Sequence, residues 1–402
     1  MGDFYQTGIV STLHRLGEPN LERLEKELDI YAEERPIALI LPSLYSELKG
    51  KALKNIVEKL KEVKYIREIV ISLGTCTKDE FKNAKEFFSV LPQKTSIIWN
   101  SGKRITSIYK TIEEAELRLG EDGKGKATWI AYGYVLSCKD LYAIALHDCD
   151  ILNYDREMLA RLCYPVVNPH LDYVFCKGYY SRITDRMHGR VTRLLFIPLV
   201  RSLQKIFGYL PLLCFLDSFR YPLAGEFSMI VDLARVIRIP SDWGLEVGVL
   251  AEVHRNCAVK RICQVDITDV YEHKHQELSP QVASKGLFKM AIDICKSLFR
   301  TLASEGIVFS EGMFKTIIAT YIKTAQDMLT RYEDDAAING LFFDRHAECL
   351  AMETFTTGIN MAAETIMKDP LGVPLIHSWD RVTSAIPNIL DTIKEAVEED
   401  NA

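Results

Sequence analysis

The sequence feature that constrains the fold most is an alternation of short apolar runs with segments of helical periodicity, between about residues 36 and 146. The apolar runs are typical of strands buried on both faces of a sheet, and they occupy residues 36–42, 66–73, 95–99 and 141–146. Apolar residues recur at helical spacing over residues 53–63, 81–88, 112–119 and 126–138. Such an alternation predicts an α/β fold, in which a parallel sheet is covered by helices on both faces.

The two ends of the chain follow a different pattern. Residues 20–34 carry leucines at helical spacing, which predicts an amphipathic helix within an N-terminal leader. Further helices are expected near the C-terminus over 284–304, 312–332 and 386–397. We therefore expect a helical leader over residues 1–35, a ligand-binding α/β domain over 36–280 and a helical region over 281–402. The helical region would pack on the α/β domain or contribute to a dimer contact.

Composition limits the classes of function. The 402 residues carry a formal net charge of −6, which argues against a general nucleic-acid binder but not against a local basic pocket. The ten cysteines form no CxxC pair, a usage typical of a reduced, cytoplasmic protein. No signal peptide is expected at the N-terminus. The most apolar stretch, 194–216, is interrupted by charges and prolines, so it predicts buried helices and no membrane span.

In an α/β sheet, ligands bind beyond the carboxyl ends of the strands. The fourth apolar run ends in His147-Asp148-Cys149-Asp150. Two carboxylates one residue apart at a strand end can hold a divalent cation together with a sugar or phosphate oxygen. The same pattern also occurs by chance in surface loops and helix caps. The segments after the other three runs, which we expect at the same edge, are residues 42–47, 72–77 and 100–103.

Two basic segments have the character of anion sites. Gly123-Lys124-Gly125-Lys126 precedes a predicted helix, where backbone N–H groups and a lysine can approach a diphosphate. Gly189-Arg190-Val191-Thr192 begins another predicted helix and offers an arginine, a hydroxyl and free N–H groups to a small anion. Without further support, the first segment is better read as a solvated loop. The second can equally be read as a helix cap with solvated basic residues.

Two further polar groups stand out from their surroundings. Glu226 lies among apolar and small residues, where it could orient a substrate hydroxyl or cap a helix beginning near Ser228. His273 and His275 follow a predicted strand over 263–267, and either could complete a metal site opposite the two aspartates. An exposed polar loop is the alternative for the two histidines.

Taken in order, these segments resemble the glucosyl-3-phosphoglycerate synthases and their mannosyl-transferring relatives, which are retaining glycosyltransferases of the GT-A (Rossmann-like) fold. The resemblance runs from about residue 36 to residue 276. It rests on an ordered set of motifs: Leu-Pro-x-Leu, Gly-Lys-Gly, Asp-x-Asp, Tyr-Tyr-x-Arg, Gly-Arg-Val-Thr, Pro-Leu-Ala-Gly-Glu, Trp-Gly-x-Glu-x-Gly and the His273 segment.

The resemblance implies a role for each matching residue. The nucleotide would be bound by Pro42, Leu44 and Glu47, and Lys124 would face the diphosphate region. Asp148 and Asp150 would bind the ribose, the sugar and Mg²⁺ or Mn²⁺. His273 would be a further metal ligand. Gly189, Arg190, Thr192 and His275 would hold the acceptor, and Glu226 would lie near the transferred sugar; Asp150, Glu226 and Arg190 are the expected catalytic residues. Relatives carry Asn-Glu directly after Pro-x-Leu, whereas here the acid is displaced by one position, and relatives use asparagine where this chain has His275. The base of the donor therefore stays open between uridine and guanosine.

The implied activity is the metal-dependent transfer of glucose from an NDP-glucose to the 2-hydroxyl of 3-phosphoglycerate. The product would be a precursor of glucosylglycerate, a compatible solute. We expect a homodimer, because dimers with two-fold symmetry are the commonest soluble oligomers. The alternatives are a mannosyl-3-phosphoglycerate synthase, another soluble or a polyprenyl-phosphate sugar transferase, and, in a different class, a non-catalytic nucleotide-sugar-binding protein.

Overall fold

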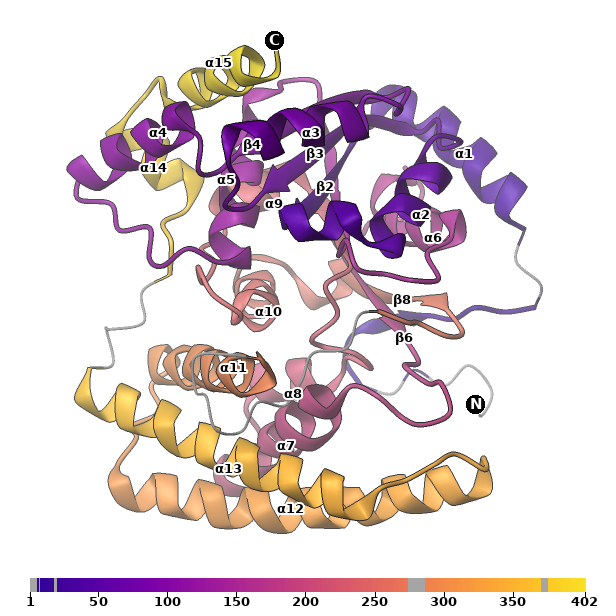
Figure 1. Ribbon diagram of the computed structural model, residues 1–402. Helices are drawn as coiled ribbons and strands as arrows, with labels where there is room; N and C mark the ends of the chain where they lie inside the picture. Colours follow the sequence, from indigo (N-terminus) through magenta and orange to yellow (C-terminus); the bar gives the residue numbers. More distant parts are fainter. Residues whose placement is uncertain (1–5, 7, 18–19, 274–285, 370–374) are drawn as a thin grey trace.

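The computed structural model describes residues 6, 8–17, 20–273, 286–369 and 375–402. Within these residues, eight strands form one sheet in the order β1-β8-β6-β7-β5-β2-β3-β4 (Figure 1). The strands are β1 (Ser11–Leu13), β2 (Ile37–Ser43), β3 (Ile66–Leu73), β4 (Lys94–Trp99), β5 (Ala143–Leu146), β6 (Phe175–Tyr180), β7 (Phe227–Ile230) and β8 (Ile262–Thr268).

The four strands expected from the apolar runs are β2 to β5, and their parallel pairing confirms the predicted α/β class. The expected strand over 263–267 is β8, which pairs in parallel with β6. The helix expected near Ser228 is wrong: Phe227–Ile230 is β7, which runs antiparallel between β5 and β6. Phe227 and Met229 are fully buried in this central position, so packing on both sides decides the conformation of the segment.

Helices α1 to α6 connect or cover the strands at the N-terminal end of the chain. They are α1 (Leu21–Glu34), α2 (Lys51–Leu60), α3 (Lys78–Phe88), α4 (Lys103–Glu114), α5 (Lys124–Ser137) and α6 (Arg156–Val167), with the short η1 (Tyr45–Lys49) after β2. The helix expected over 112–119 is wrong, because α4 is already ending there. Glu116 adopts a positive φ of 60°, and the N–H of Leu117 donates to the carbonyl of Ile112, a left-handed helix end.

The sheet separates two apolar cores. Along β2, Ala38 and Ile40 belong to one core, whereas Ile37, Leu39 and Leu41 belong to the other, as the two-residue period of a strand requires. The first core continues into the helices that lie between β6 and β8 in sequence. These are η2 (Val191–Phe196), α7 (Ile197–Phe207), α8 (Pro211–Asp217), α9 (Val231–Val236) and α10 (Leu245–Asn256), and η3 (Val259–Arg261) leads into β8. The expected pair of buried helices in 194–216 is therefore α7 and α8.

The C-terminal helices divide between two places. Helices α11 (Gly286–Ser304), α12 (Glu311–Ile338) and α13 (Arg345–Lys368) form a layer away from the sheet and pack on α7 and η2 (Figure 1). Helices α14 (Trp379–Ala385) and α15 (Ile389–Asn401) return to the sheet beside α5 and β4, where the rings of Trp379 and Trp129 stack 4.1 Å apart. The division of the chain into three domains stays a prediction. In the described part of the chain, no helix is both long and apolar enough to cross a membrane.

Candidate active site

A cavity of about 730 Å³ opens at the carboxyl edge of the sheet, between the strands and the C-terminal helical layer. Its walls include residues from every strand end that the sequence pointed to, among them Pro42, Ser72, Asn100 and Asp148. Ten of the predicted site residues line it: Pro42, Leu44, Glu47, Lys124, Asp148, Asp150, Gly189, Arg190, Thr192 and His273. Glu226 does not line it, and His275 lies outside the described residues.

The end of β5 directs two carboxylates into this cavity. Exposure alternates along the segment, so that His147 and Cys149 are buried while Asp148 and Asp150 are partly exposed. Burial lowers the pKa of His147 to about 3, which keeps this side chain neutral. The acids at positions 148 and 150 are therefore the polar groups that this strand end presents to a ligand.

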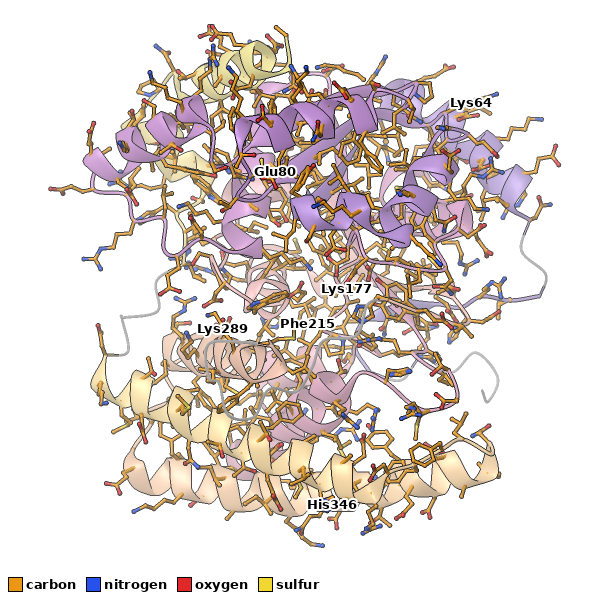
Figure 2. All side chains as sticks on the ribbon, viewed as in Figure 1. Lys64, Glu80, Lys177, Phe215, Lys289 and His346 are labelled. Atoms are coloured by element: carbon orange, nitrogen blue, oxygen red, sulfur yellow. The ribbon has the colours of Figure 1, made fainter. Side chains whose placement is uncertain are left out.

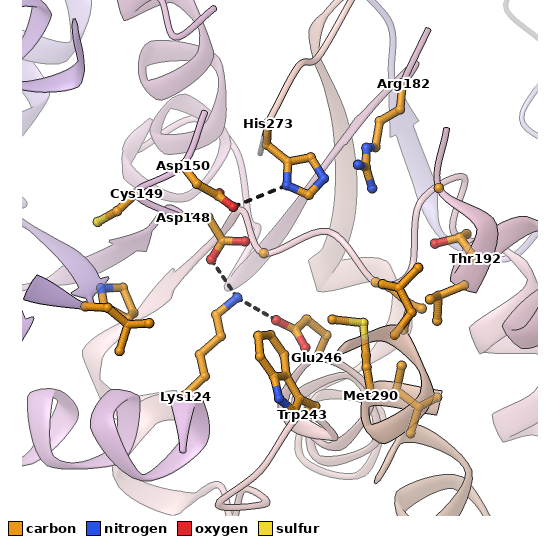
Figure 3. Close-up of a pocket in the computed structure, with 18 of the residues that line it drawn as sticks. Lys124, Asp148, Cys149, Asp150, Arg182, Thr192, Trp243, Glu246, His273 and Met290 are labelled. Carbon is orange, nitrogen blue, oxygen red and sulfur yellow. Dashed lines mark hydrogen bonds and ion pairs between the residues drawn. The ribbon is translucent and has the colours of Figure 1, made fainter. Parts of the chain in front are cut away.

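Lys124 joins the first of these carboxylates to a second acid. Its Nζ lies 2.6 Å from Oδ1 of Asp148 and 2.9 Å from Oε1 of Glu246 (Figure 3). Burial favours the neutral amine, but the two carboxylates outweigh it and hold the pKa of Lys124 well above its usual value. Lys124 is the first residue of α5. The next residue, Gly125, packs so closely on Pro240 that a Cβ at position 125 would lie 1.9 Å from the Pro240 carbonyl oxygen. The cavity therefore contains a fixed ammonium at a helix N-terminus.

Glu246 was not predicted as a site residue. It lies in the first turn of α10, within the Trp-Gly-x-Glu-x-Gly motif, and lines the cavity together with Trp243 (Figure 3). The motif could have indicated Glu246 as a site residue, but only the structure shows that this acid faces Lys124.

The second carboxylate faces a histidine from a distant segment. Oδ2 of Asp150 lies 3.3 Å from Nδ1 of His273, which is held near by a β-bridge between His273 and Ile151 (Figure 3). Burial acts to raise the pKa of Asp150, but the hydrogen bond and charge of His273 and the charge of Lys124 prevail and lower it. Asp150 is thus ionised at neutral pH, as a metal ligand must be.

Glu226 lies behind the cavity wall and forms no helix cap. Its carboxylate accepts hydrogen bonds from the hydroxyls of Tyr180 (2.8 Å) and Tyr271 (2.6 Å), whose rings stack 3.7 Å apart and line the cavity. Burial and the nearby charge of Asp148 raise the pKa of Glu226. The preceding Gly225 packs on Asp148, where a Cβ would lie 2.3 Å from Oδ2. Two tyrosines that line the cavity therefore bind the Glu226 carboxylate, and a role for Glu226 near the transferred sugar stays a prediction.

Lys177 in β6 is a fully buried cation below the same loop, in the middle of the molecule (Figure 2). Its Nζ donates to the carbonyl of Ala224 at 2.6 Å and lies 5.3 Å from the centre of the Phe227 ring. Burial lowers the pKa of Lys177 to about 8, although Glu246 and Glu226 oppose this change. This lysine ties the loop of Gly225 and Glu226 to the sheet.

The lowered pKa of Lys177 predicts a pH-dependent stability. The unfolded chain keeps this proton up to about pH 10.4, whereas the folded chain loses it near pH 8, so the unfolded state binds more protons between these values. The free energy of unfolding should consequently rise with pH, by about 2–3 kcal/mol between pH 7 and pH 10. Urea unfolding of the wild type and of Lys177→Met at both pH values would measure it. The wild type should gain this amount over the variant, and parallel pH profiles would contradict the prediction.

The predicted acceptor segment forms another wall of the cavity. Gly189 has a φ of 73°, which the lack of a Cβ permits, and it leads into Arg190 and the π-helix η2 with Thr192. Figure 3 shows Arg182 and Thr192 across the pocket from Lys124. Nε of Arg190 donates to Oε1 of Glu348 in α13 at 2.7 Å.

The C-terminal helical layer was not expected to contribute to the site. Phe342, Phe343, Asp344 and Glu348, which lie before and at the start of α13, nevertheless line the cavity. The N–H of Phe342 donates to the carbonyl of Asp185 at 2.8 Å, so this segment is attached to the loop that precedes Gly189. The sequence offered no signal here, because α13 itself was not predicted.

Solved structures identify the fold as that of a GT-A glycosyltransferase, an enzyme class that uses nucleotide-sugar donors. The glucosyl-3-phosphoglycerate synthase of Mycobacterium tuberculosis, in complex with Mn²⁺, UDP-glucose and phosphoglyceric acid, matches with a TM-score of 0.54 and 20% identity over 75% of this chain and 89% of that one. The mannosyl-3-phosphoglycerate synthase of Rubrobacter xylanophilus matches with a TM-score of 0.54 and 19% identity over 75% and 83% of the chains. At these identities the similarity establishes the fold.

Full-length relatives establish the family. A glucosyl-3-phosphoglycerate synthase of Persephonella marina is 48% identical over the whole of both chains. One of Methanococcoides burtonii is 40% identical over 98% of this chain and 97% of that one. No protein-family model matches the chain. The chain belongs to the glucosyl-3-phosphoglycerate synthases, which are glycosyltransferases.

Proposed function

We propose that this chain transfers glucose, with retention of configuration, from an NDP-glucose to the 2-hydroxyl of 3-phosphoglycerate. The observation that carries the proposal is a single cavity that joins the acids and lysine at the end of β5 to the arginine-bearing wall of Gly189 to Thr192. A nucleotide-sugar diphosphate and a small phosphorylated acid need these two environments side by side. The full-length relatives of the same name support the choice of reaction.

On the donor side, the proposed contacts follow the strand ends. Pro42, Leu44 and Glu47 would bind the nucleoside, and Glu47 lines the cavity despite its displacement by one position from the relatives' acid. Ser72 and Asn100, which line the same part of the cavity, add hydrogen-bonding groups that were not predicted individually. Lys124 and Asp148 would bind the diphosphate region and the sugar.

We further propose that Asp150 and His273, with Asp148 nearby, hold Mg²⁺ or Mn²⁺. Among the described residues, no group of three or more histidine, cysteine, aspartate or glutamate side chains has the arrangement of a metal site. An ionised carboxylate beside an imidazole nonetheless fits a cation that obtains its remaining ligands from diphosphate oxygens and water. When bound, such a cation supplies the positive charge that neutralises a departing diphosphate.

The remaining catalytic work is positioning. Arg190 and Thr192 would orient 3-phosphoglycerate so that its 2-hydroxyl attacks the anomeric carbon from the face of the departing group. The new C–O bond forms as the bond to the diphosphate breaks, and the departing phosphate oxygen takes the hydroxyl proton. Glu226 would act through Tyr180 and Tyr271, whose hydroxyls it orients, because its carboxylate is enclosed behind them.

A screen of UDP- and GDP-glucose and UDP- and GDP-mannose against 3-phosphoglycerate and glycerate tests this function. We expect transfer from a glucose donor to 3-phosphoglycerate, with a kcat/KM at least about tenfold above that for the matching mannose donor. Glycerate lacks the phosphate that the arginines would bind, so its kcat/KM should be at least about a hundredfold lower. Release of nucleoside diphosphate and the mass of the product provide the two measurements.

The outcomes separate the alternatives. A preference for mannose would make the chain a mannosyl-3-phosphoglycerate synthase. Binding of a nucleotide-sugar without transfer to either acceptor would indicate a non-catalytic binding protein. Reactions without acceptor serve as the control for donor hydrolysis.

We also propose a cytoplasmic homodimer with no nucleic-acid partner. All ten cysteines are free, a state typical of a reducing compartment. The net charge of −6 disfavours nucleic acid, and two-fold dimers are the commonest soluble assemblies.

A further inference from the structure

Glu348 is a buried acid that connects the C-terminal helical layer to the acceptor wall. It lies in the first turn of α13, and its side chain is only 6% exposed. Its two oxygens bind two different arginines: Oε1 accepts from Nε of Arg190 at 2.7 Å, and Oε2 accepts from Nη2 of Arg193 at 2.9 Å. The charge of this buried acid is therefore compensated by two guanidinium groups.

The contact leaves the terminal nitrogens of Arg190 available. Among the described residues, Glu348 is the only hydrogen-bond partner of the Arg190 side chain, and the donor in this bond is Nε of Arg190. The Arg190 side chain is 34% exposed and lines the cavity. A long, partly exposed arginine side chain has considerable rotamer freedom unless a contact fixes one side of its guanidinium group. Glu348 binds the Nε side of the guanidinium and leaves the two terminal nitrogens to bind an anion.

Glu348 is itself held in place through Arg193. Arg193 donates to the carbonyls of His188 (2.8 Å) and Met187 (3.3 Å), and its guanidinium lies 4.9 Å from the centre of the Tyr332 ring in α12. The position of Arg190 is therefore set by a chain of contacts from the 187–188 backbone through Arg193 and Glu348.

We propose that Glu348 is a positioning residue for the acceptor, which fixes the Arg190 guanidinium for the carboxylate or phosphate of 3-phosphoglycerate. The C-terminal helical layer thus takes part in acceptor recognition. This inference rests on the proposed function, because it assumes that the anion at this wall is the acceptor. It assigns Glu348 no contact with the reacting atoms.

The test is a comparison of Glu348→Gln, Arg190→Ala and the double variant. Glutamine keeps the volume of the side chain but can accept a hydrogen bond through only one of its two terminal atoms, so at least one arginine contact is lost. We expect 3-phosphoglycerate to bind the Glu348→Gln variant about tenfold more weakly in calorimetry with UDP present, whereas the affinity for UDP itself stays within twofold of the wild type. Acceptor kcat/KM should fall in parallel. The double variant should be no worse than Arg190→Ala, because Glu348 acts through Arg190.

Glu252→Gln provides the matched control. Glu252 is a similarly buried acid whose Oε1 lies 3.6 Å from both Arg238 and Arg255, and it does not line the cavity. Its substitution removes a comparable acid without touching the acceptor wall, so acceptor binding should stay at the wild-type value. If Glu348→Gln does not fold, Glu348→Asp retracts the carboxylate by one methylene while keeping its charge, and the same weakening is expected.

Each result bears on the inference differently. Unchanged or tighter acceptor binding in both Glu348 variants, or additive losses in the double variant, would overturn the positioning role while the proposed function stands. A wild-type chain that does not bind 3-phosphoglycerate would overturn the inference and the proposed acceptor together.

Discussion

Replacing Asp150 by alanine is expected to lower glucosyl transfer by at least about a thousandfold, because the change removes the ionised carboxylate of the proposed cation site. The variant should remain folded, since Asp150 lies at a partly exposed strand end whose backbone pairing does not depend on the side chain. Initial rates over a range of Mg²⁺ concentrations, together with circular dichroism, would measure both effects. Binding of Mn²⁺ in the presence of UDP should weaken as well.

Asp140→Ala supplies the control for this experiment. Asp140 is an exposed residue of the turn before β5, at the opposite end of the strand from the cavity, and its loss should leave transfer unchanged. Full activity of Asp150→Ala in metal-stripped buffer would refute the assignment of the cation site to this residue.

The second large effect is expected for Arg190→Ala. The change removes the guanidinium that would bind an anionic group of the acceptor, so the KM for 3-phosphoglycerate should rise by at least about thirtyfold while the donor KM changes by less than about twofold. Steady-state kinetics with each substrate varied in turn would separate the two constants. Equal effects on donor and acceptor would argue against an acceptor role.

Arg201→Ala tests whether loss of any arginine–carboxylate pair has this consequence. Arg201 in α7 donates to Asp217 at 2.9 Å and does not line the cavity. Both KM values of this variant should match the wild type, and a raised acceptor KM here would show that the effect of Arg190→Ala is not local.

The fold was predictable where local pattern and burial agree. The runs that became β2 to β5 are short and largely buried on both faces, which favours strands of a parallel sheet over helices. Prediction failed where tertiary contacts override the pattern. The segment at Phe227 became a strand because β5 and β6 leave a central position for it. The helix expected over 112–119 failed for a local reason, because Glu116 adopts a left-handed conformation that ends α4.

The same distinction between local pattern and tertiary contacts applies to the residues of the candidate site. The strand-end rule located Asp148 and Asp150, because side-chain alternation along β5 is a local property and the β-α connections predict parallel strands. The partners of these groups come from distant segments that no spacing relates to them. Glu246 faces Lys124 across 122 residues of sequence, and Glu348 faces Arg190 across 158.

The sequence by itself therefore determined the α/β class, the edge of the sheet that carries the site, and ten of the residues that line the cavity. Only the tertiary structure decided how the charges there are balanced. It placed Glu226 behind two tyrosines, paired Lys124 with two acids and brought Glu348 of α13 against Arg190. The physical reason is that side-chain periodicity is a short-range property of the backbone, whereas the pairing of buried charges depends on which distant elements pack together.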